Sequence, residues 1–252
     1  MEAGRRLIPP VRALLGIAAG GVVGLLVTQI LLLSRRTYLP MDPGYTIDER
    51  VGAASGIPLR LAVLGDSTVA GVGSPTARES LPVLIGLRVA AATGRPVHVI
   101  GLGVSGARTG TIAHQLERLA DLERVDAIVI VIGSNDATHA TPWMRFRRET
   151  DRMLARAAGL ASVVVLAGTP RFKGNRIIPE PLRTMLDAYS GLLRAQQREA
   201  VARRPATRFV DLAADASPRF LGVPAATSVD GFHPSPIGYG FWADALAPAV
   251  TG

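Results

Sequence analysis

Short apolar runs alternate with amphipathic stretches along most of the chain, from residue 59 to its end. The apolar runs are rich in Val, Ile and Leu and alternate little with polar residues, which is typical of strands covered on both faces. This alternation predicts a parallel sheet with helices on both sides. The predicted strands are RLAVLG (60–65), VHVIG (97–101), DAIVIVIG (126–133), SVVVLAG (162–168) and TRFVDL (207–212). The predicted helices lie around residues 79–92, 109–123, 143–158, 181–204 and 236–248.

The N-terminal part of the chain has a different pattern. Residues 13–33 read ALLGIAAGGVVGLLVTQILLL without a single charge. A helix of this length spans about 30 Å, the thickness of a bilayer core, and the run is longer than the roughly 7–15 residues of a signal peptide. The sequence therefore predicts an uncleaved transmembrane anchor over residues 13–34, with a cleaved signal as the alternative.

Four segments follow from this reading. We expect a short N-terminal tail (1–12), the anchor (13–34), a linker rich in Pro and Gly (35–58) and one globular domain (59–252). The protein would then be a single-pass protein of the cell membrane. The basic residues around the anchor favour an extracytoplasmic domain, although the opposite orientation is left open.

Composition excludes several classes of protein. Hydrophobic residues make up 48% of the chain and charged residues 19%, so wholesale disorder is excluded. The chain has no Cys, which rules out disulfide scaffolds, zinc ribbons and thiol nucleophiles, and its four His form no H-E-x-x-H motif. The formal net charge is +8, but the Arg residues are scattered and no recognition motif appears. We therefore expect no nucleic-acid partner.

Candidate chemistry lies just after the predicted strands, because sites gather at the carboxyl ends of parallel strands. Ser67 follows the first strand between small neighbours that leave its hydroxyl exposed. Asp230 and His233 are three residues apart, a spacing that lets the carboxylate accept from one imidazole nitrogen while the other faces Ser67. Asn135 and the backbone amide of Gly106 follow two other strands and could hold an oxyanion together with the Ser67 amide.

These residues stand in blocks that resemble those of the SGNH (GDSL-type) hydrolases. The blocks are GDSTVAG (65–71), GVSGA (103–107), GSND (133–136) and DGFHP (230–234), and the resemblance covers roughly residues 59–250. It implies a flavodoxin-like three-layer α/β/α sandwich with a sheet of five parallel strands. It also implies Ser67 as nucleophile, Asp230 and His233 as its triad partners, and Ser67, Gly106 and Asn135 as the oxyanion hole. No metal or organic cofactor is implied.

Two features of the second block bear on this reading. The family often has an Asn a few residues before the block's Gly, and here Gly101 stands there, so the assignment stays open between Gly106 and Gly103. The same stretch reads Gly101-x-Gly103-x-x-Gly106 after a strand, which is the dinucleotide-binding fingerprint. That alternative needs an acidic residue at the end of the next strand, whereas Asp126 begins that strand.

The sequence thus predicts a membrane-anchored serine esterase or lipase that cleaves carboxylic esters of small molecules, carbohydrates or lipids through a Ser67 acyl-enzyme. An acyltransferase that passes the acyl group to a sugar or other hydroxyl is the alternative. A non-catalytic lipid- or carbohydrate-binding module is a more distant one. Candidate substrate contacts are His139, near the third block, and the cations Arg171 and Lys173, which precede Arg176 in the loop after the fourth strand. This loop is either solvated or attracts an anionic part of the substrate.

Overall fold

The centre of the molecule is a sheet of six strands in the order β1-β3-β2-β4-β5-β6. This computed structural model describes residues 9–122 and 124–252, with side chains described from residue 20 onward. The strands are β1 (Ile47–Val51), β2 (Leu59–Gly65), β3 (Val97–Gly101), β4 (Val125–Val131), β5 (Ala161–Ala167) and β6 (Thr207–Val210). Each of the five predicted strands overlaps one of β2 to β6, and these five strands run parallel to one another.

The prediction of a flavodoxin-like sheet of five parallel strands is nevertheless wrong, because the sheet is mixed. β1 pairs antiparallel with β3, so that Ile47 lies opposite Gly101 and Val51 opposite Val97. β1 belongs to the segment interpreted as a linker. Its sequence IDERV has only two apolar residues, Ile47 and Val51, which are buried while the charged residues between them are not. A short edge strand of this composition gives no continuous apolar run in the sequence.

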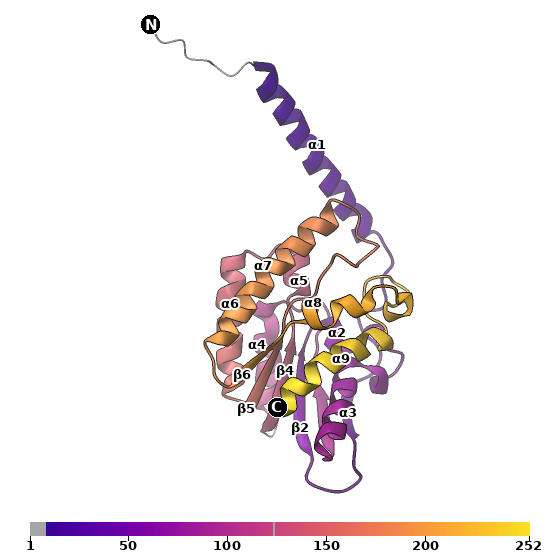
Figure 1. Ribbon diagram of the computed structural model, residues 1–252, viewed down its shortest axis with the longest axis vertical. Helices are drawn as coiled ribbons and strands as arrows, with labels where there is room; N and C mark the ends of the chain where they lie inside the picture. The colour runs from indigo at the N-terminus through magenta and orange to yellow at the C-terminus, as the bar shows by residue number, and fades with distance from the viewer. Residues whose placement is uncertain (1–8, 123) are drawn as a thin grey trace.

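Helices cover both faces of the sheet (Figure 1). Helices α3 and α9 pack on one face, and α4, α6 and α7 pack on the other. Along β2, Leu61 and Val63 belong to the first core while Ala62 and Leu64 belong to the second, as the alternation of side chains in a strand requires. The helices are α1 (Pro9–Ser34), α2 (Ser67–Ala70), α3 (Leu81–Thr93), α4 (Ile112–Ala120), α5 (Ser134–Thr138), α6 (Trp143–Ala158), α7 (Leu182–Ala202), α8 (Leu212–Asp215) and α9 (Pro236–Thr251).

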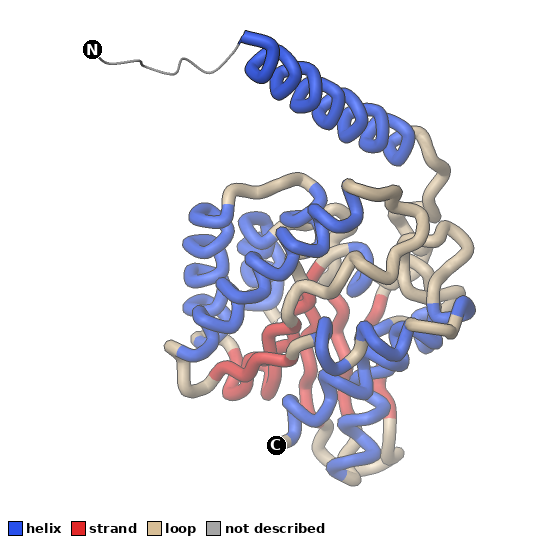
Figure 2. The backbone as a smooth tube through the Cα atoms, turned by 45° about the horizontal axis from the view of Figure 1, so that its top comes forward, coloured by secondary structure: helices blue, strands red, loops and turns tan. Residues whose placement is uncertain are grey.

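Helix α1 extends away from the rest of the molecule (Figures 1 and 2), but its C-terminal half contacts the protein. The Gln29 carboxamide donates to the Glu180 carbonyl oxygen over 2.6 Å and accepts from the Leu182 amide over 3.3 Å. Leu26 and Leu33 pack against a third apolar cluster that includes Leu182. This end of α1 is therefore bound to the segment that enters α7.

The predicted membrane anchor and the predicted location in the cell membrane are contradicted. Among the residues that the structure describes, no helix is long and apolar enough to cross a membrane. Within the apolar run, the Gln29 side chain bonds to the backbone of Glu180 and of Leu182. The side chains of residues 13–19, which complete the predicted anchor, lie outside the described part.

Candidate active site

A sharp turn at the end of β2 presents Ser67. The Asp66 carboxylate accepts hydrogen bonds from the amide and the hydroxyl of Thr68, at 3.0 and 2.8 Å, and so caps α2. Gly71 ends this short helix with a φ of +103°, a left-handed conformation that favours glycine. Asp66 is buried, and burial raises its pKa while the bonds from Thr68 act in the opposite direction. The turn is thus fixed on both sides of Ser67.

A buried glutamine holds the strand end that precedes this turn. Gln115 of α4 accepts from the Gly65 amide over 2.9 Å and donates to the Gly65 carbonyl oxygen over 2.7 Å. A second glutamine, Gln197 of α7, bonds to the residues that follow β4 and β5. It accepts from the Thr169 amide over 2.8 Å and donates to the Ile132 carbonyl oxygen over 3.0 Å. These two side chains fix the carboxyl ends of β2, β4 and β5, where the site lies.

Ser67, His233 and Asp230 form one continuous chain of hydrogen bonds. The Ser67 Oγ lies 3.1 Å from His233 Nε2, and His233 Nδ1 lies 2.6 Å from Asp230 Oδ2. All three side chains are buried. The structure therefore brings together the three residues that the sequence assigns to a triad, although they are separated by more than half of the chain.

Asp230 is held by further hydrogen bonds. Its Oδ1 accepts from the amides of Phe232 and His233, at 2.8 and 3.0 Å, and its Oδ2 also accepts from the Leu39 amide at 3.4 Å. Burial by itself would raise the pKa of Asp230, but the bonds from the His233 side chain and from these two amides lower it below its ordinary value. Asp230 is therefore kept as the carboxylate that can orient a histidine.

Asn135, Gly106 and Ser67 supply the donors of a candidate oxyanion hole. Asn135 Nδ2 donates one hydrogen to the Ala107 carbonyl oxygen over 3.0 Å, a bond to the turn that carries Gly106. No other described residue accepts from Nδ2, so its second hydrogen can reach an oxyanion. Gly106 has a φ of +79° in this turn. Within the described ranges, the amides of Ser67 and Gly106 donate to no other backbone group.

Asp136 connects the two halves of this candidate hole. Its Oδ2 accepts from the amide and the hydroxyl of Thr109, each at 2.9 Å, and thereby joins α5, which carries Asn135, to the segment after Gly106. Asp136 is fully buried, and burial raises its pKa while the bonds from Thr109 oppose this. The spacing of Asn135 and Gly106 therefore depends in part on the carboxylate of the residue that follows Asn135 in the chain.

The glycines of the Gly101-x-Gly103-x-x-Gly106 motif are explained by packing. A Cβ on Gly103 would lie 2.2 Å from the backbone nitrogen of Ala70, in the turn that carries Ser67. A Cβ on Gly101 would lie 2.9 Å from the Cβ of Ile47 in β1. Close approach of the backbone to other protein segments thus accounts for two of the glycines, and a dinucleotide is not needed to explain them.

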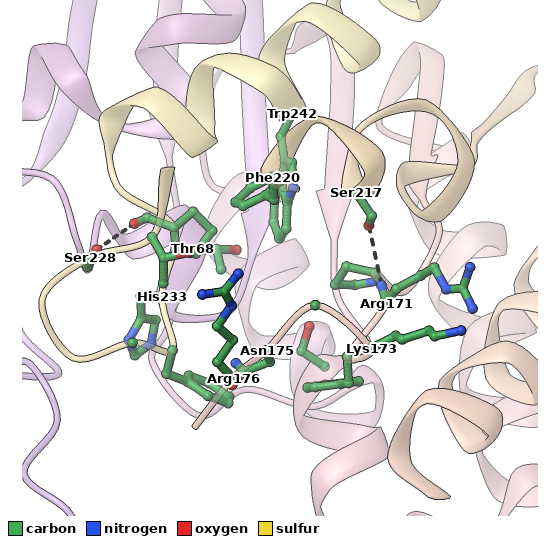
Figure 3. Close-up of a pocket in the computed structure, with 18 of the residues that line it drawn as sticks. Thr68, Arg171, Lys173, Asn175, Arg176, Ser217, Phe220, Ser228, His233 and Trp242 are labelled. Atoms are coloured by element: carbon green, nitrogen blue, oxygen red, sulfur yellow. Dashed lines mark hydrogen bonds between the residues drawn. The ribbon is translucent and has the colours of Figure 1, made fainter. Parts of the chain in front are cut away.

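Ser67, Asn135 and His233 line a pocket of about 710 Å³ (Figure 3), a volume in the ordinary range for small-molecule sites. One wall comes from the loop after β5, residues 170–177, and another from the segment before α9. The apolar part of the lining includes Phe172, Ile177, Phe220, Leu221, Val223, Phe232 and Trp242. In the described part of the chain, no group of three or more His, Asp or Glu side chains is arranged to hold a metal ion.

The three candidate substrate contacts lie in different places. Arg171 and Lys173 line the pocket, but Arg171 is paired with Asp187 at 2.9 Å. His139 does not line the pocket: its Nδ1 lies 2.9 Å from the Asn135 carbonyl oxygen, and its side chain is exposed. Arg176, which the sequence groups with the other two cations, also lines the pocket.

Several residues that build the site were missed in the sequence. Gln115 lies in the apolar stripe of α4, at helical spacing from Ile112 and Leu119, and a polar residue in such a stripe was the available signal. Asp136 follows Asn135 directly in the GSND block. The Leu39 amide gave no signal, because its contact with Asp230 joins residues almost two hundred positions apart.

Comparison with known proteins agrees with this geometry. The sequence model of the GDSL-like lipase/acylhydrolase family matches residues 63–241. A GDSL-like esterase of Mycobacterium tuberculosis is 28% identical over 194 residues, which are 76% of this chain and 62% of that protein, so the chain spans less than two thirds of this relative.

Solved structures share the fold. An acetylxylan esterase from Geobacillus stearothermophilus superimposes with a TM-score of 0.58 at 19% identity, over 80% of this chain and 96% of that one. A lipase/acylhydrolase from Enterococcus faecalis superimposes with a TM-score of 0.60 at 25% identity, over 75% and 94% of the two chains. Since the family's sequence model covers well over half of the chain, the resemblance seen in the sequence is confirmed: this protein belongs to the GDSL-like lipase/acylhydrolase family.

Proposed function

We propose that the protein is a serine esterase that cleaves carboxylic esters through an acyl-enzyme on Ser67. The observation that carries this proposal is the buried chain of hydrogen bonds from Ser67 Oγ through His233 to Asp230, which opens into the pocket. A serine hydroxyl is a weak nucleophile unless a base takes its proton, and His233 Nε2 is in position to do so. The esterases and lipase among the relatives support the same reaction class.

In the first half of the reaction, Ser67 Oγ attacks the acyl carbonyl carbon while its proton moves to His233 Nε2. The carbonyl oxygen becomes an oxyanion, which the amides of Ser67 and Gly106 and the Asn135 carboxamide stabilise. His233 then gives the proton to the leaving alkoxide, so that the carbon–oxygen bond to the alcohol breaks and an acyl-enzyme remains. Asp230 holds His233 in the required orientation and stabilises its imidazolium.

In the second half, water takes the place of the alcohol. His233 removes a proton from the water, whose oxygen attacks the acyl carbon, and the same donors stabilise the second oxyanion. The bond to Ser67 Oγ breaks, Ser67 regains its proton from His233, and the carboxylic acid leaves. Transfer to a sugar hydroxyl would share every step up to the acyl-enzyme and differ only in the acceptor.

The Ser67→Ala variant tests this proposal on p-nitrophenyl acetate. We expect turnover to fall by several orders of magnitude while circular dichroism shows an unchanged fold, because the nucleophile is lost. A variant that keeps more than about a tenth of the activity would exclude Ser67 as nucleophile. Product analysis with and without an added sugar separates hydrolysis, which yields free acid alone, from transfer, which yields an acylated sugar.

A further inference from the structure

The pocket next to Ser67 has an uneven distribution of charge. Its charged lining consists of three cationic side chains, Arg171, Lys173 and Arg176, and one carboxylate, Asp66. Asp66 lies at the bottom, fully buried and already bonded to Thr68. The mouth of the pocket is therefore cationic, and it faces an otherwise largely apolar lining.

Arg171 is used to build the loop. Its guanidinium pairs with Asp187 Oδ2 at 2.9 Å, while Asp187 Oδ1 accepts from the amides of Phe172 and Lys173 at 2.9 and 3.0 Å. Burial would raise the pKa of Asp187, but these bonds, with that of Arg171 foremost, lower it. Since Asp187 carries a negative charge at neutral pH, it neutralises Arg171, which is left with little attraction for a substrate.

Arg176 differs from Arg171 both in its pairing and in the direction of its side chain. Within the part of the chain that the structure describes, its guanidinium has neither a carboxylate within ion-pair distance nor a hydrogen-bond acceptor, and the side chain is exposed. Figure 3 shows it extending into the middle of the pocket, on the side of Thr68 and His233, whereas Arg171 and Lys173 point the other way. An unpaired guanidinium in this position is available to a ligand.

The backbone next to Arg176 is fixed against the catalytic loop. The Ile177 amide donates to Asn175 Oδ1 over 3.2 Å, and Ile177 packs so closely on Gly231 that a Cβ there would lie 2.6 Å from Ile177 Cγ2. Gly231 lies between Asp230 and His233 in the chain. The backbone at Arg176 therefore has a defined position against the loop that carries His233.

We propose that Arg176 binds an anionic oxygen group, a carboxylate or a phosphate, on the alcohol part of the ester. This inference rests on the proposed function, because it takes His233 as the acid that protonates the leaving alcohol. The group nearest His233 in the bound ester is then the alcohol. A guanidinium matches the two oxygens of a carboxylate or phosphate with two parallel hydrogen bonds, so Arg176 acts as a specificity-determining residue.

The test compares aryl esters that carry an anion on the alcohol part, an anion on the acyl part or no charge. The anionic substrates are 4-acetoxybenzoate and 4-acetoxyphenyl phosphate, and the neutral reference is methyl 4-acetoxybenzoate. Mono-(4-nitrophenyl) succinate carries its charge on the acyl side instead. The variants are Arg176→Gln, Arg176→Lys and, as a control with the same change in net charge, Arg118→Gln on the exposed face of α4, outside the pocket.

We expect Arg176→Gln to lower kcat/KM for the two anionic acetates about tenfold more than for the neutral ester. A tenfold difference is at the low end of what a charge-assisted hydrogen bond contributes, and we expect the low end because Arg176 is exposed to solvent. The difference should shrink between 0.1 and 1 M salt, where the screening length falls from about 10 to about 3 Å. Arg176→Lys should restore part of the preference for the anionic esters. Arg118→Gln should leave kcat/KM for all four substrates unchanged.

Three outcomes would overturn the proposal. An equal loss on charged and neutral esters would make Arg176 a support of the loop. A loss confined to the succinate ester would place the anion on the acyl side. If the wild-type preference for the anionic acetates remains in Arg176→Gln, other residues cause that preference. Failure of the proposed function itself is distinguishable, since the wild-type protein would then not hydrolyse the neutral ester through Ser67.

Discussion

Replacing Gln115 by Met should weaken both the fold and the reaction, although the side chain contacts no substrate. Methionine keeps the length and approximate volume of glutamine but makes neither of the bonds to Gly65, at 2.9 and 2.7 Å. Gln115 is only 1% exposed, so water cannot take its place. The Gly65 carbonyl oxygen keeps the Val104 amide as a second donor at 3.1 Å, whereas the Gly65 amide loses its acceptor.

The expected loss of stability follows from these contacts. An orphaned buried amide costs about 1–3 kcal/mol, and the loss of one of two bonds at the carbonyl adds about 0.5–1.5 kcal/mol, which together give about 1.5–4.5 kcal/mol. Most of the protein stays folded, because domains have about 5–15 kcal/mol of stability. Gly65 lies two residues before Ser67, and small displacements of reacting groups cost up to about a hundredfold in rate, so we expect kcat to fall about 10–100-fold.

Urea unfolding and steady-state kinetics on p-nitrophenyl acetate measure the two effects. Leu154→Ala is the matched control, because Leu154 is fully buried in α6 away from the pocket and its truncation costs about 2–5 kcal/mol. The control should lose similar stability and keep its kcat. A stability loss below about 1 kcal/mol for Gln115→Met, or a kcat equal to that of Leu154→Ala, would contradict this prediction.

Three further predictions concern other parts of the site. Asn135→Ala should lower kcat about 10²–10³-fold with little change in KM, because its donor acts on the oxyanion; steady-state kinetics that give a normal kcat and a raised KM would make it a ground-state contact instead. Asp187→Asn should reduce the urea midpoint at pH 7. Arg171 and two amides lower the pKa of Asp187 against the effect of burial, so its contribution is fully present above the ordinary value of 3.8 and is lost as pH falls through the lower folded value. The gap between the two midpoints should therefore narrow below pH 3.8, and a constant gap would contradict this. Removing residues 1–34 should lower the melting temperature by about 4–8 °C, for the roughly 2 kcal/mol of apolar contacts and Gln29 hydrogen bonds that are lost; an unchanged melting curve would show that α1 does not stabilise the domain.

Much of the central sheet could be predicted because its strands are continuous apolar runs. A strand such as β4, buried on both faces, is apolar at every position except the exposed Asp126, and this leaves a strong signal in the sequence. β1 gave no such signal, because it is short and three of its five residues are charged. The mixed sheet was therefore missed, although the parallel part was found.

The candidate triad could also be predicted, since short motifs carry it. Ser67 lies in one block and both Asp230 and His233 lie in another, so few residues had to be placed relative to one another. The supporting contacts could not be predicted in the same way. The bonds of Gln115 to Gly65 join residues fifty positions apart, and the contact of Leu39 with Asp230 joins residues 191 positions apart. Such contacts depend on how the elements pack.

The apolar N-terminal run shows the limit of composition as a guide. The absence of charge predicted a membrane anchor, but Gln29 in the same run bonds to Glu180 and Leu182. Leu26 and Leu33 also pack on the protein. A hydrophobicity count does not show which side chains of such a run contact protein: Leu26 and Leu33 do, whereas the side chains of Val22, Val23 and Leu25 are exposed.

Covalent labelling followed by mass spectrometry shows whether Ser67 is the nucleophile of this protein. A fluorophosphonate reacts with an activated serine, whose Oγ displaces fluoride and keeps the phosphonyl group. We predict a single adduct on the peptide that contains Ser67, with no adduct on Ser67→Ala. An adduct on another residue, such as Ser105, or labelling of Ser67→Ala at the wild-type rate would contradict the account.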